Sequence, residues 1–505
     1  MLKRIRVIIA IISILAITLL FLDFTGLAQQ WWGWLVNVQL VPAFLSVNLI
    51  AIIFLMLLTL IMGRVYCSVL CPLGILQDII THIRGWFEKK QTRKNRFNYT
   101  KPKTWLRVGV LIGFILLIIM GFCNIIGTTF VSFIEPYSAY GRIASSLFAP
   151  IYKLGNNMIA EAMSDTDCYL FYSVENYRYL PVVLIAVVTL FVIGVMAWIG
   201  GRVYCNTICP VGTILGYLCK YSLLKPVINT GKCNGCKKCE RNCKASCIDA
   251  KNHKIDYSRC VMCMNCINNC NTKAIKYTWR RDNLSRILEE RKEENISIGR
   301  RNFMATGVMF ATIAVTKATD KTIDGGLAPI IDKQKPQRKC RIAPPGAVSL
   351  AHLQQHCTGC QLCISSCPNG VLRPSTTLET FMQPVVEYER GYCRPECVRC
   401  SNACPTGAFH AISIEEKSSI QIGRAVVKLD ACIMAAKGRK CGNCADKCPT
   451  GAIKIVPTNS SGAKSRYMPV VNESKCIGCG ACEYYCPIRP LSAIYVNGNE
   501  VHRSI

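Results

Sequence analysis

The residues with the clearest chemistry are cysteines, which number 33 in a chain of 505 residues. Sixteen of them form four groups near the C-terminus, and a proline follows the last cysteine of each group. Three thiolates at short gaps bind one face of a 4Fe-4S cube, and a fourth cysteine followed by proline ligates a neighbouring cube. The pattern therefore predicts four one-electron carriers. The groups are Cys357, Cys360, Cys363 and Cys367; Cys393, Cys397, Cys400 and Cys404; Cys432, Cys441, Cys444 and Cys448; Cys476, Cys479, Cys482 and Cys486.

The repeated quartets fit neither of the common alternatives. Zinc ribbons use pairs of CxxC, and disulfide frameworks belong to short secreted chains. The pairing of the groups stays open at this point, because the fourth cysteine of a group completes the cluster of its partner group. The first group could pair with the second and the third with the fourth, or the first with the fourth and the second with the third.

A smaller unit upstream carries two more groups of the same kind. Its spacing is that of a two-cluster bacterial ferredoxin, although Lys244 and Asn271 stand where proline usually follows the fourth cysteine. In the usual exchange Cys270 completes the first cluster and Cys243 the second. The predicted ligands are Cys233, Cys236, Cys239, Cys243, Cys260, Cys263, Cys266 and Cys270.

Composition places part of the chain in a membrane, since 51% of the residues are hydrophobic and the mean hydropathy is +0.27. Uncharged apolar runs at 7–22, 43–62, 108–126 and 181–200 are each about long enough to cross a hydrocarbon core of about 30 Å. Lys and Arg concentrate between 64 and 103, which places that loop, the N-terminus and the two-cluster unit in the cytoplasm.

The formal charge of +30 does not indicate a nucleic-acid partner. Each oxidised 4Fe-4S centre with four thiolates carries about −2, so six centres would lower the charge to about +18. The remaining basic residues are distributed as expected for a membrane protein, with an excess of Lys and Arg on the cytoplasmic side. We therefore expect no nucleic acid among the partners.

An internal repeat follows the second and fourth apolar runs. The two copies read GRVYCSVLCPLG at 63–74 and GRVYCNTICPVG at 201–212. A duplicated helix pair in one orientation predicts a pseudo-twofold axis that brings both motifs together. Cys67, Cys71, Cys205 and Cys209 then either form a seventh metal or redox site, with Arg64 and Arg202 balancing its charge, or are buried thiols beside topology-anchoring arginines.

A twin-arginine segment, RRNFM at 300–304, precedes a short apolar stretch. This pattern is typical of an export signal for folded, cofactor-loaded domains, and the alternative is an interfacial helix with a basic flank.

These motifs divide the chain into four parts. They are a four-helix membrane domain (1–225), a two-cluster domain (226–280), a linker with an internal signal or fifth, anchoring helix (281–325) and a four-cluster domain (326–505).

A quinol site is expected on the outer side, after the third apolar run. There Glu135 could accept a proton, and Tyr137 or Arg142 could hold a ring oxygen. The alternative is an ordinary helix start with proline in its first turn.

The six histidines all lie outside the apolar runs, so a transmembrane bis-His haem is excluded, and no nicotinamide or flavin site is recognised.

With these motifs, residues 1 to about 280 resemble the NapH-type membrane quinol dehydrogenase subunit of periplasmic nitrate reductase systems. Residues 298–505 look like the NapG-type exported four-cluster partner. The resemblance implies a membrane α-helical protein with α+β ferredoxin-like domains, placed in the bacterial inner membrane with the four-cluster domain in the periplasm. It implies electron transfer from menaquinol or ubiquinol, through six or seven 4Fe-4S clusters, to a periplasmic reductase or cytochrome.

Two rival functions remain open. A soluble cytoplasmic ferredoxin could instead feed the clusters that reduce quinone, and redox titration would separate the directions because cluster potentials span about −700 to +450 mV. The protein could also be a membrane redox accessory that matures a metalloenzyme. Its loss would then leave quinol oxidation intact and yield an enzyme without its metal.

Overall fold

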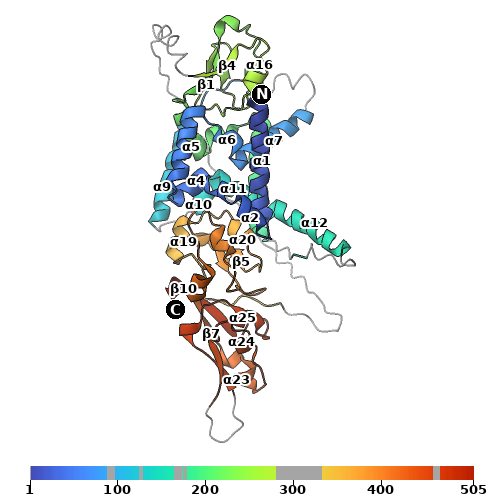
Figure 1. The fold of residues 1–505 in the computed structure, drawn as a ribbon, viewed down its shortest axis with the longest axis vertical. Coiled ribbons are helices and arrows are strands. Elements are labelled where there is room, and N and C mark those ends of the chain that lie inside the picture. The colour runs from blue at the N-terminus through green and yellow to red at the C-terminus, as the bar shows by residue number, and fades with distance from the viewer. Residues whose placement is uncertain are drawn as a thin grey trace.

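The computed structural model describes residues 2–87, 97–123, 129–163, 173–174, 179–279, 332–458 and 467–505. The chain is elongated: a helical bundle lies in the middle, a small cysteine-rich unit at one end and a larger one at the opposite end (Figure 1). The predicted twin-arginine segment at Arg300 and Arg301 lies outside the described residues.

The bundle takes up the chain from the N-terminus to residue 219. Three of its helices, α1, α9 and α13, are long and apolar enough to cross a membrane. Their outward faces carry exposed apolar side chains such as Ile8, Ile112 and Val188, as expected of helices in contact with lipid. The helices are α1 (Leu2–Leu22), α2 (Leu27–Trp32), α3 (Trp34–Asn37), α4 (Leu40–Leu45), α5 (Leu49–Met62), α6 (Tyr66–Val69), α7 (Pro72–Phe87), α9 (Thr104–Phe122), α10 (Thr129–Ile134), α11 (Pro136–Ile143), η1 (Ala144–Phe148), α12 (Ala149–Ala162), α13 (Leu180–Gly200), α14 (Val203–Thr207) and α15 (Pro210–Cys219).

The predicted apolar run at 43–62 is not one continuous helix. Helix α4 ends at Leu45, Val47 has a positive φ of 54°, and Asn48 caps α5 by accepting a hydrogen bond from the backbone N–H of Ala51. The 14 residues of α5 span about 21 Å, which is less than a hydrocarbon core of about 30 Å. The counts of four or five spans therefore stay predictions.

The predicted duplication is visible in the order of the helices. The same order of three helices occurs twice, as α5, α6 and α7 and again as α13, α14 and α15. In each case an apolar helix is followed by a one-turn helix and then by a helix that begins at proline. Helix α7 packs against α13 and α15 against α5, so each half of the repeat contacts the other.

The small unit consists of short elements around its cysteines. Strand β1 pairs antiparallel with β4, and β2 with β3, while α16 and α17 each carry the third cysteine of a group. The elements are β1 (Leu224–Ile228), η2 (Thr230–Lys232), α16 (Lys238–Arg241), β2 (Ile248–Asp249), β3 (Lys254–Ile255), α17 (Asn265–Asn268) and β4 (Ile275–Trp279).

The large unit repeats this design with three two-stranded antiparallel sheets, β5 with β6, β7 with β10 and β8 with β9. The α+β ferredoxin-type character of both units agrees with the prediction. The elements are α19 (Leu350–His356), α20 (Leu362–Ser365), β5 (Leu372–Pro374), η3 (Leu378–Thr380), β6 (Pro384–Val386), α21 (Arg399–Asn402), α22 (Ile414–Ser419), β7 (Ile420–Val427), η4 (Leu429–Ala431), α23 (Ile433–Lys437), α24 (Asn443–Asp446), β8 (Ile453–Pro457), β9 (Tyr467–Val471), η5 (Glu473–Lys475), α25 (Ala481–Tyr485) and β10 (Ile494–Ser504).

Both units are packed onto the bundle. The apolar core of the bundle continues into the small unit and also includes Cys360 and Leu362 of the large unit. Where the large unit meets the bundle, the side chain of Arg399 donates to the carbonyl of Phe24 over 2.9 Å, and the side chain of Gln355 donates to the carbonyl of Phe122 over 3.1 Å. The first cysteine group of the large unit therefore lies against the end of the bundle.

Candidate iron-sulfur centres

The cysteines of the small unit surround two cavities in the exchanged arrangement. One cavity is lined by Cys233, Cys236, Cys239 and Cys270, and the other by Cys260, Cys263, Cys266 and Cys243. In each set the fourth cysteine comes from the other group. Lys244 and Asn271, which replace the usual prolines, do not prevent this arrangement.

The large unit resolves the alternative that the spacing left open. Cys448 lines one cavity with Cys476, Cys479 and Cys482, whereas Cys486 lines another with Cys432, Cys441 and Cys444. The third group is thus combined with the fourth.

The first group is combined with the second in the same way. The thiol of Cys404 lies close enough to Cys357, Cys360 and Cys363 to interact electrostatically with all three. The thiol of Cys367 interacts with Cys393 and Cys400.

A shared backbone turn explains how four of the six groups wrap their cavities. The residues directly before and after the second cysteine have positive φ values, which reverses the chain twice and leads into the short helix that carries the third cysteine. The groups that begin at Cys393 and Cys432 have longer gaps and lack this turn. The pairs are Gly235 and Lys237, Met262 and Met264, Gly359 and Gln361, and Gly478 and Gly480.

The donor sets fit clusters better than single ions. Among the described residues, no three His, Cys, Asp or Glu side chains converge closely enough to hold one metal ion. A 4Fe-4S cube keeps its four thiolates farther apart than a tetrahedral zinc ion does, so four thiols around a cavity match a cube.

Lysines near the cysteines supply compensating charge. The ammonium of Lys417 is buried and donates to the carbonyls of Arg394 and Cys397. Lys333 donates to the carbonyl of Cys486 over 3.2 Å, and burial lowers the pKa of its ammonium to about 8. Both cations lie where thiolate-bound clusters would place negative charge.

The repeated motif forms a further four-cysteine site inside the bundle. Cys67, Cys71, Cys205 and Cys209 are all buried, belong to one core and interact electrostatically with one another. They lie directly beneath the small unit, because the side chain of Asn206 donates to the carbonyl of Ala245 over 3.2 Å.

The two motifs are joined by crossed arginines. Arg64 donates to the carbonyl of Cys205 over 3.2 Å, and Arg202 donates to the carbonyl of Cys67 over 2.7 Å. A side chain in place of Gly74 would lie 2.6 Å from Arg202, and one in place of Gly212 would lie 2.9 Å from Arg64. An added side chain would lie even closer to the carbonyl of Cys67 or Cys205, so the glycine of each motif makes room for this carbonyl and for the arginine of the other motif that donates to it.

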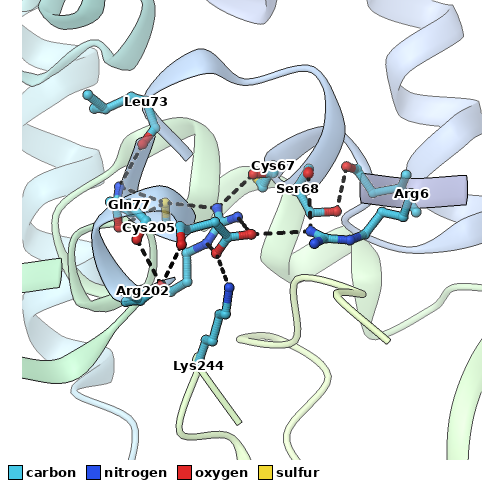
Figure 2. Close-up of polar contacts among 11 residues, drawn as sticks. Arg6, Cys67, Ser68, Leu73, Gln77, Arg202, Cys205 and Lys244 are labelled. Carbon is cyan, nitrogen blue, oxygen red and sulfur yellow. Dashed lines mark hydrogen bonds and ion pairs between the residues drawn. The ribbon is translucent and has the colours of Figure 1, made fainter. Parts of the chain in front are cut away.

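Arg202 has a carboxylate partner. Its guanidinium lies 2.9 Å from Asp78, which also pairs with Lys244 at 3.3 Å and with Arg6 at 3.2 Å (Figure 2). Figure 2 also shows Gln77 beside Cys205, where its side-chain nitrogen lies 3.4 Å from the sulfur. Sequence alone offered no sign that α7 contributes these two polar residues.

Arg64 has no such partner among the residues that the structure describes. It is fully buried and donates to Asn206 over 3.1 Å, to the carbonyl of Ser258 over 3.0 Å and towards the sulfur of Cys67 at 3.8 Å. An isolated buried cation is costly, so it needs nearby negative charge. Thiolates, or an anionic cluster held by them, would supply that charge.

The predicted quinol residues lie together in a buried corner. Glu135 is the N-cap of α11 and accepts hydrogen bonds from the backbone N–H groups of Tyr137 and Ser138. Arg142 donates to Ser132, and neither Glu135, Tyr137 nor Arg142 is more than 1% exposed. These contacts match the alternative of a proline-started helix.

Sequence reasoning left two cysteines of this region without a role. The sulfur of Cys247 lies 3.5 Å from that of Cys243 and lines the same cavity. Cys219 is fully buried, and its thiol lies 4.0 Å from the carbonyl of Cys260. The only available signal was the residue type, because neither cysteine falls within a CxxC spacing.

Taken together, the folded cysteine quartets define an iron-sulfur protein. Comparison with known protein families agrees: a "4Fe-4S binding domain" matches residues 45–94 and 179–228, which contain the two repeated motifs. A "4Fe-4S dicluster domain" matches 437–489, and another "4Fe-4S binding domain" matches 354–370. No solved structure matches the chain.

Individual relatives show which family of iron-sulfur proteins the chain is similar to. The ferredoxin-type protein NapF of Escherichia coli K12 is 31% identical over 161 residues, which are 31% of this chain and 87% of NapF. NapG of the same strain is 27% identical over 154 residues (29% of this chain, 66% of NapG). The methylamine utilization ferredoxin-type protein MauM of Methylobacillus flagellatus is 29% identical over 150 residues (29% of this chain, 63% of MauM). The chain belongs to the ferredoxin-type protein family that includes NapF, while the NapH-type fusion stays a prediction.

The charge network of Figure 2 can be tested with Asp78→Asn. The substitution keeps the shape of the side chain but leaves the buried guanidinium of Arg202 without its carboxylate. We expect the free energy of unfolding to fall by roughly 3 kcal/mol, since breaking a buried ion pair from one side is strongly destabilising. Thermal unfolding of the protein in detergent would measure the loss. Asp249→Asn is the control, because the carboxylate of Asp249 is exposed and bonds only within its own turn; equal melting temperatures for both variants would contradict the prediction.

Iron analysis tests the four-cysteine site in the bundle. A protein with seven 4Fe-4S centres holds about 28 iron atoms per chain, and one with six holds about 24. We expect replacement of Cys67, Cys71, Cys205 and Cys209 by serine to remove about four iron atoms. Serine at Cys123, an exposed cysteine outside every quartet, should remove none. Iron that is unchanged in the quadruple variant would show that these cysteines are buried thiols only.

Proposed function

We propose that this protein transfers single electrons across a membrane through a continuous file of seven 4Fe-4S centres. The observation that carries the proposal is the order of the cysteine sites along the long axis of the molecule. The two sites of the small unit come first, the site of the repeated motifs lies within the bundle, and the four sites of the large unit follow at the other end (Figure 1).

The step from the small unit into the bundle rests on contacts around Arg64. This arginine reaches the carbonyl of Ser258 in the small unit and lies beside Cys67 of the motif site. Ser258 comes two residues before Cys260, one of the proposed ligands. Arg64 therefore contacts both the motif site and the segment that leads into the cavity lined by Cys243, Cys260, Cys263 and Cys266.

The step from the bundle to the large unit passes the corner at Glu135. The hydroxyl of Tyr204, which belongs to the second motif, donates to the carbonyl of Ile134 over 2.6 Å. On the far side of this corner, Tyr137 and Glu135 lie close enough to interact electrostatically with Cys360. In this proposal Glu135, Tyr137 and Arg142 fill the space between the motif site and the first centre of the large unit. They do not bind quinol.

Within the large unit the file continues outward. The backbone N–H of Cys393 donates to the carbonyl of Cys479 over 2.9 Å, which joins the first pair of groups to the second pair. Cys482 interacts electrostatically with Cys444, which places the cavity of Cys432, Cys441, Cys444 and Cys486 at the outer end. No haem is needed for such a path.

The charge pattern and the position of the units support an orientation. Basic residues flank the end of the bundle that carries the small unit, which favours the cytoplasmic side of a bacterial inner membrane. The large unit, at the opposite end, would then lie in the periplasm. We propose quinol as an electron donor and a periplasmic reductase or cytochrome as the acceptor, in keeping with the redox role of ferredoxin-type relatives. We also propose that the small unit exchanges electrons with a redox protein in the cytoplasm.

Reconstitution into sealed vesicles tests the file directly. We expect a membrane-impermeant dye trapped inside to be reduced when a membrane-impermeant reductant is added outside, with an ionophore present to dissipate the charge. The rate should fall at least about tenfold in the variant with serine at Cys67, Cys71, Cys205 and Cys209, because the file would lose its central carrier.

The control is Cys340→Ser, since Cys340 belongs to no quartet. Electron paramagnetic resonance of both variants would establish that the other clusters are present. Undiminished reduction of the trapped dye by the quadruple variant would contradict a path through the bundle and favour an accessory role on one side of the membrane.

A further inference from the structure

We propose that the quinone headgroup binds in a cavity of about 300 Å³ between the end of the bundle and the first cysteine group of the large unit. This inference rests on the proposed function, because it gives the quinol substrate a site. It replaces the corner at Glu135, Tyr137 and Arg142, where the carboxylate of Glu135 already caps α11 and Arg142 already donates to Ser132.

The cavity lies at the level expected for a headgroup site. Its walls include Phe21 and Leu22 at the end of α1 and Val182 and Val183 at the start of α13. Both helices are candidate membrane spans, so their ends lie near the interface between hydrocarbon and water. An apolar ring with polar oxygens is suited to this position.

Gln361 supplies a hydrogen-bond donor to the cavity. Its side chain is only 5% exposed and its oxygen accepts a hydrogen bond from the hydroxyl of Ser145 over 2.9 Å. Its side-chain nitrogen has no partner among the described residues, although it is buried and Gln361 lines the cavity. A buried donor left without an acceptor is costly, and a quinone carbonyl oxygen would satisfy it.

The bundle contributes a second polar wall. Ser145 and Ser146 belong to η1, a π-helical segment, and such segments occur frequently at functional sites. Lys153 of α12 also lines the cavity. A cation at this place can hold a second ring oxygen, so the two polar walls can bind both oxygens of one ring.

The cavity is next to two proposed centres. Cys367 lines it directly, and Gln361 follows Cys360 in the chain. Oxidation of one quinol breaks two O–H bonds, releases two protons to water and yields two electrons. Oxidised 4Fe-4S clusters held by the quartets of Cys360 and Cys367 would accept one electron each. Cys360 and Cys367 belong to different quartets, so both electron acceptors lie at one site.

Binding of a quinone analogue to the full-length protein in nanodiscs tests this site without relying on electron transfer. The probe is a fluorescent hydroxyquinoline N-oxide, whose emission is quenched on binding. We expect the Kd to rise by about tenfold or more in Gln361→Met and in Ser145→Ala with Lys153→Met. The first variant removes the amide donor to the ring, and the second removes the Lys153 cation and the hydroxyl that orients Gln361. Gln355→Met is the matched control, since this glutamine lies at the same junction but outside the cavity, and its Kd should be unchanged.

Photolabelling with an azidonaphthoquinone gives a second readout. The label should appear on peptides that contain Ser145 or Gln361, and iron content should stay at the wild-type value in all variants. An unchanged Kd in the cavity variants, or a label confined to the Glu135 peptide, would overturn this site but leave quinol as the donor. If the wild-type protein binds neither probe, both the site and the quinol substrate are wrong.

Discussion

The placement of buried positive charge is the constraint on which the centre of this molecule depends. Two guanidinium groups lie inside an apolar helical bundle, each reaching across to the backbone of the opposite motif. Burying them is favourable only where anions are near, because the low dielectric of the interior makes an uncompensated charge very costly. Asp78 lies beside Arg202, and the buried thiol of Cys67 lies beside Arg64.

The same pair of arginines also joins the parts of the chain. Arg64 bonds to Ser258 of the small unit, and the backbone N–H of Arg202 donates to the carbonyl of Lys244 over 2.9 Å. The small unit is therefore attached to the residues that surround the motif cysteines, and not to a peripheral loop. In the proposed path, such an attachment would fix the distance between the centre of the small unit and the centre of the motif site, as electron transfer requires.

The contact between the large unit and the other end of the bundle is both apolar and polar. Cys360 and Leu362 take part in the core of the bundle, while Arg399 and Gln355 donate to carbonyls of Phe24 and Phe122. A four-cluster ferredoxin unit alone would expose these groups to water. Here they bring the first centre of the unit, and the cavity beside it, to the end of the candidate spans.

The sequence alone predicts the ligand groups, the duplicated motif and the membrane character. Cysteine spacing is a local property, because three thiols within seven residues can reach one cube only through a tight turn. It also indicated that the two motifs meet, since a duplicated helix pair implies a symmetric arrangement. Only the tertiary structure decided the pairing of the four C-terminal groups, because a fourth ligand comes from a distant part of the chain.

Other features likewise depend on contacts between segments that are far apart in the sequence. Asp78 meets Arg202 across 124 positions of the sequence. The break at residues 46–48, by contrast, coincides with two polar residues, Ser46 and Asn48, within an uncharged run. Glu135 has the residue type of a proton acceptor, yet the fold uses its carboxylate as a helix cap. Gln361 has an ordinary polar type, and its importance appears only where packing buries its side-chain nitrogen without a partner among the described residues.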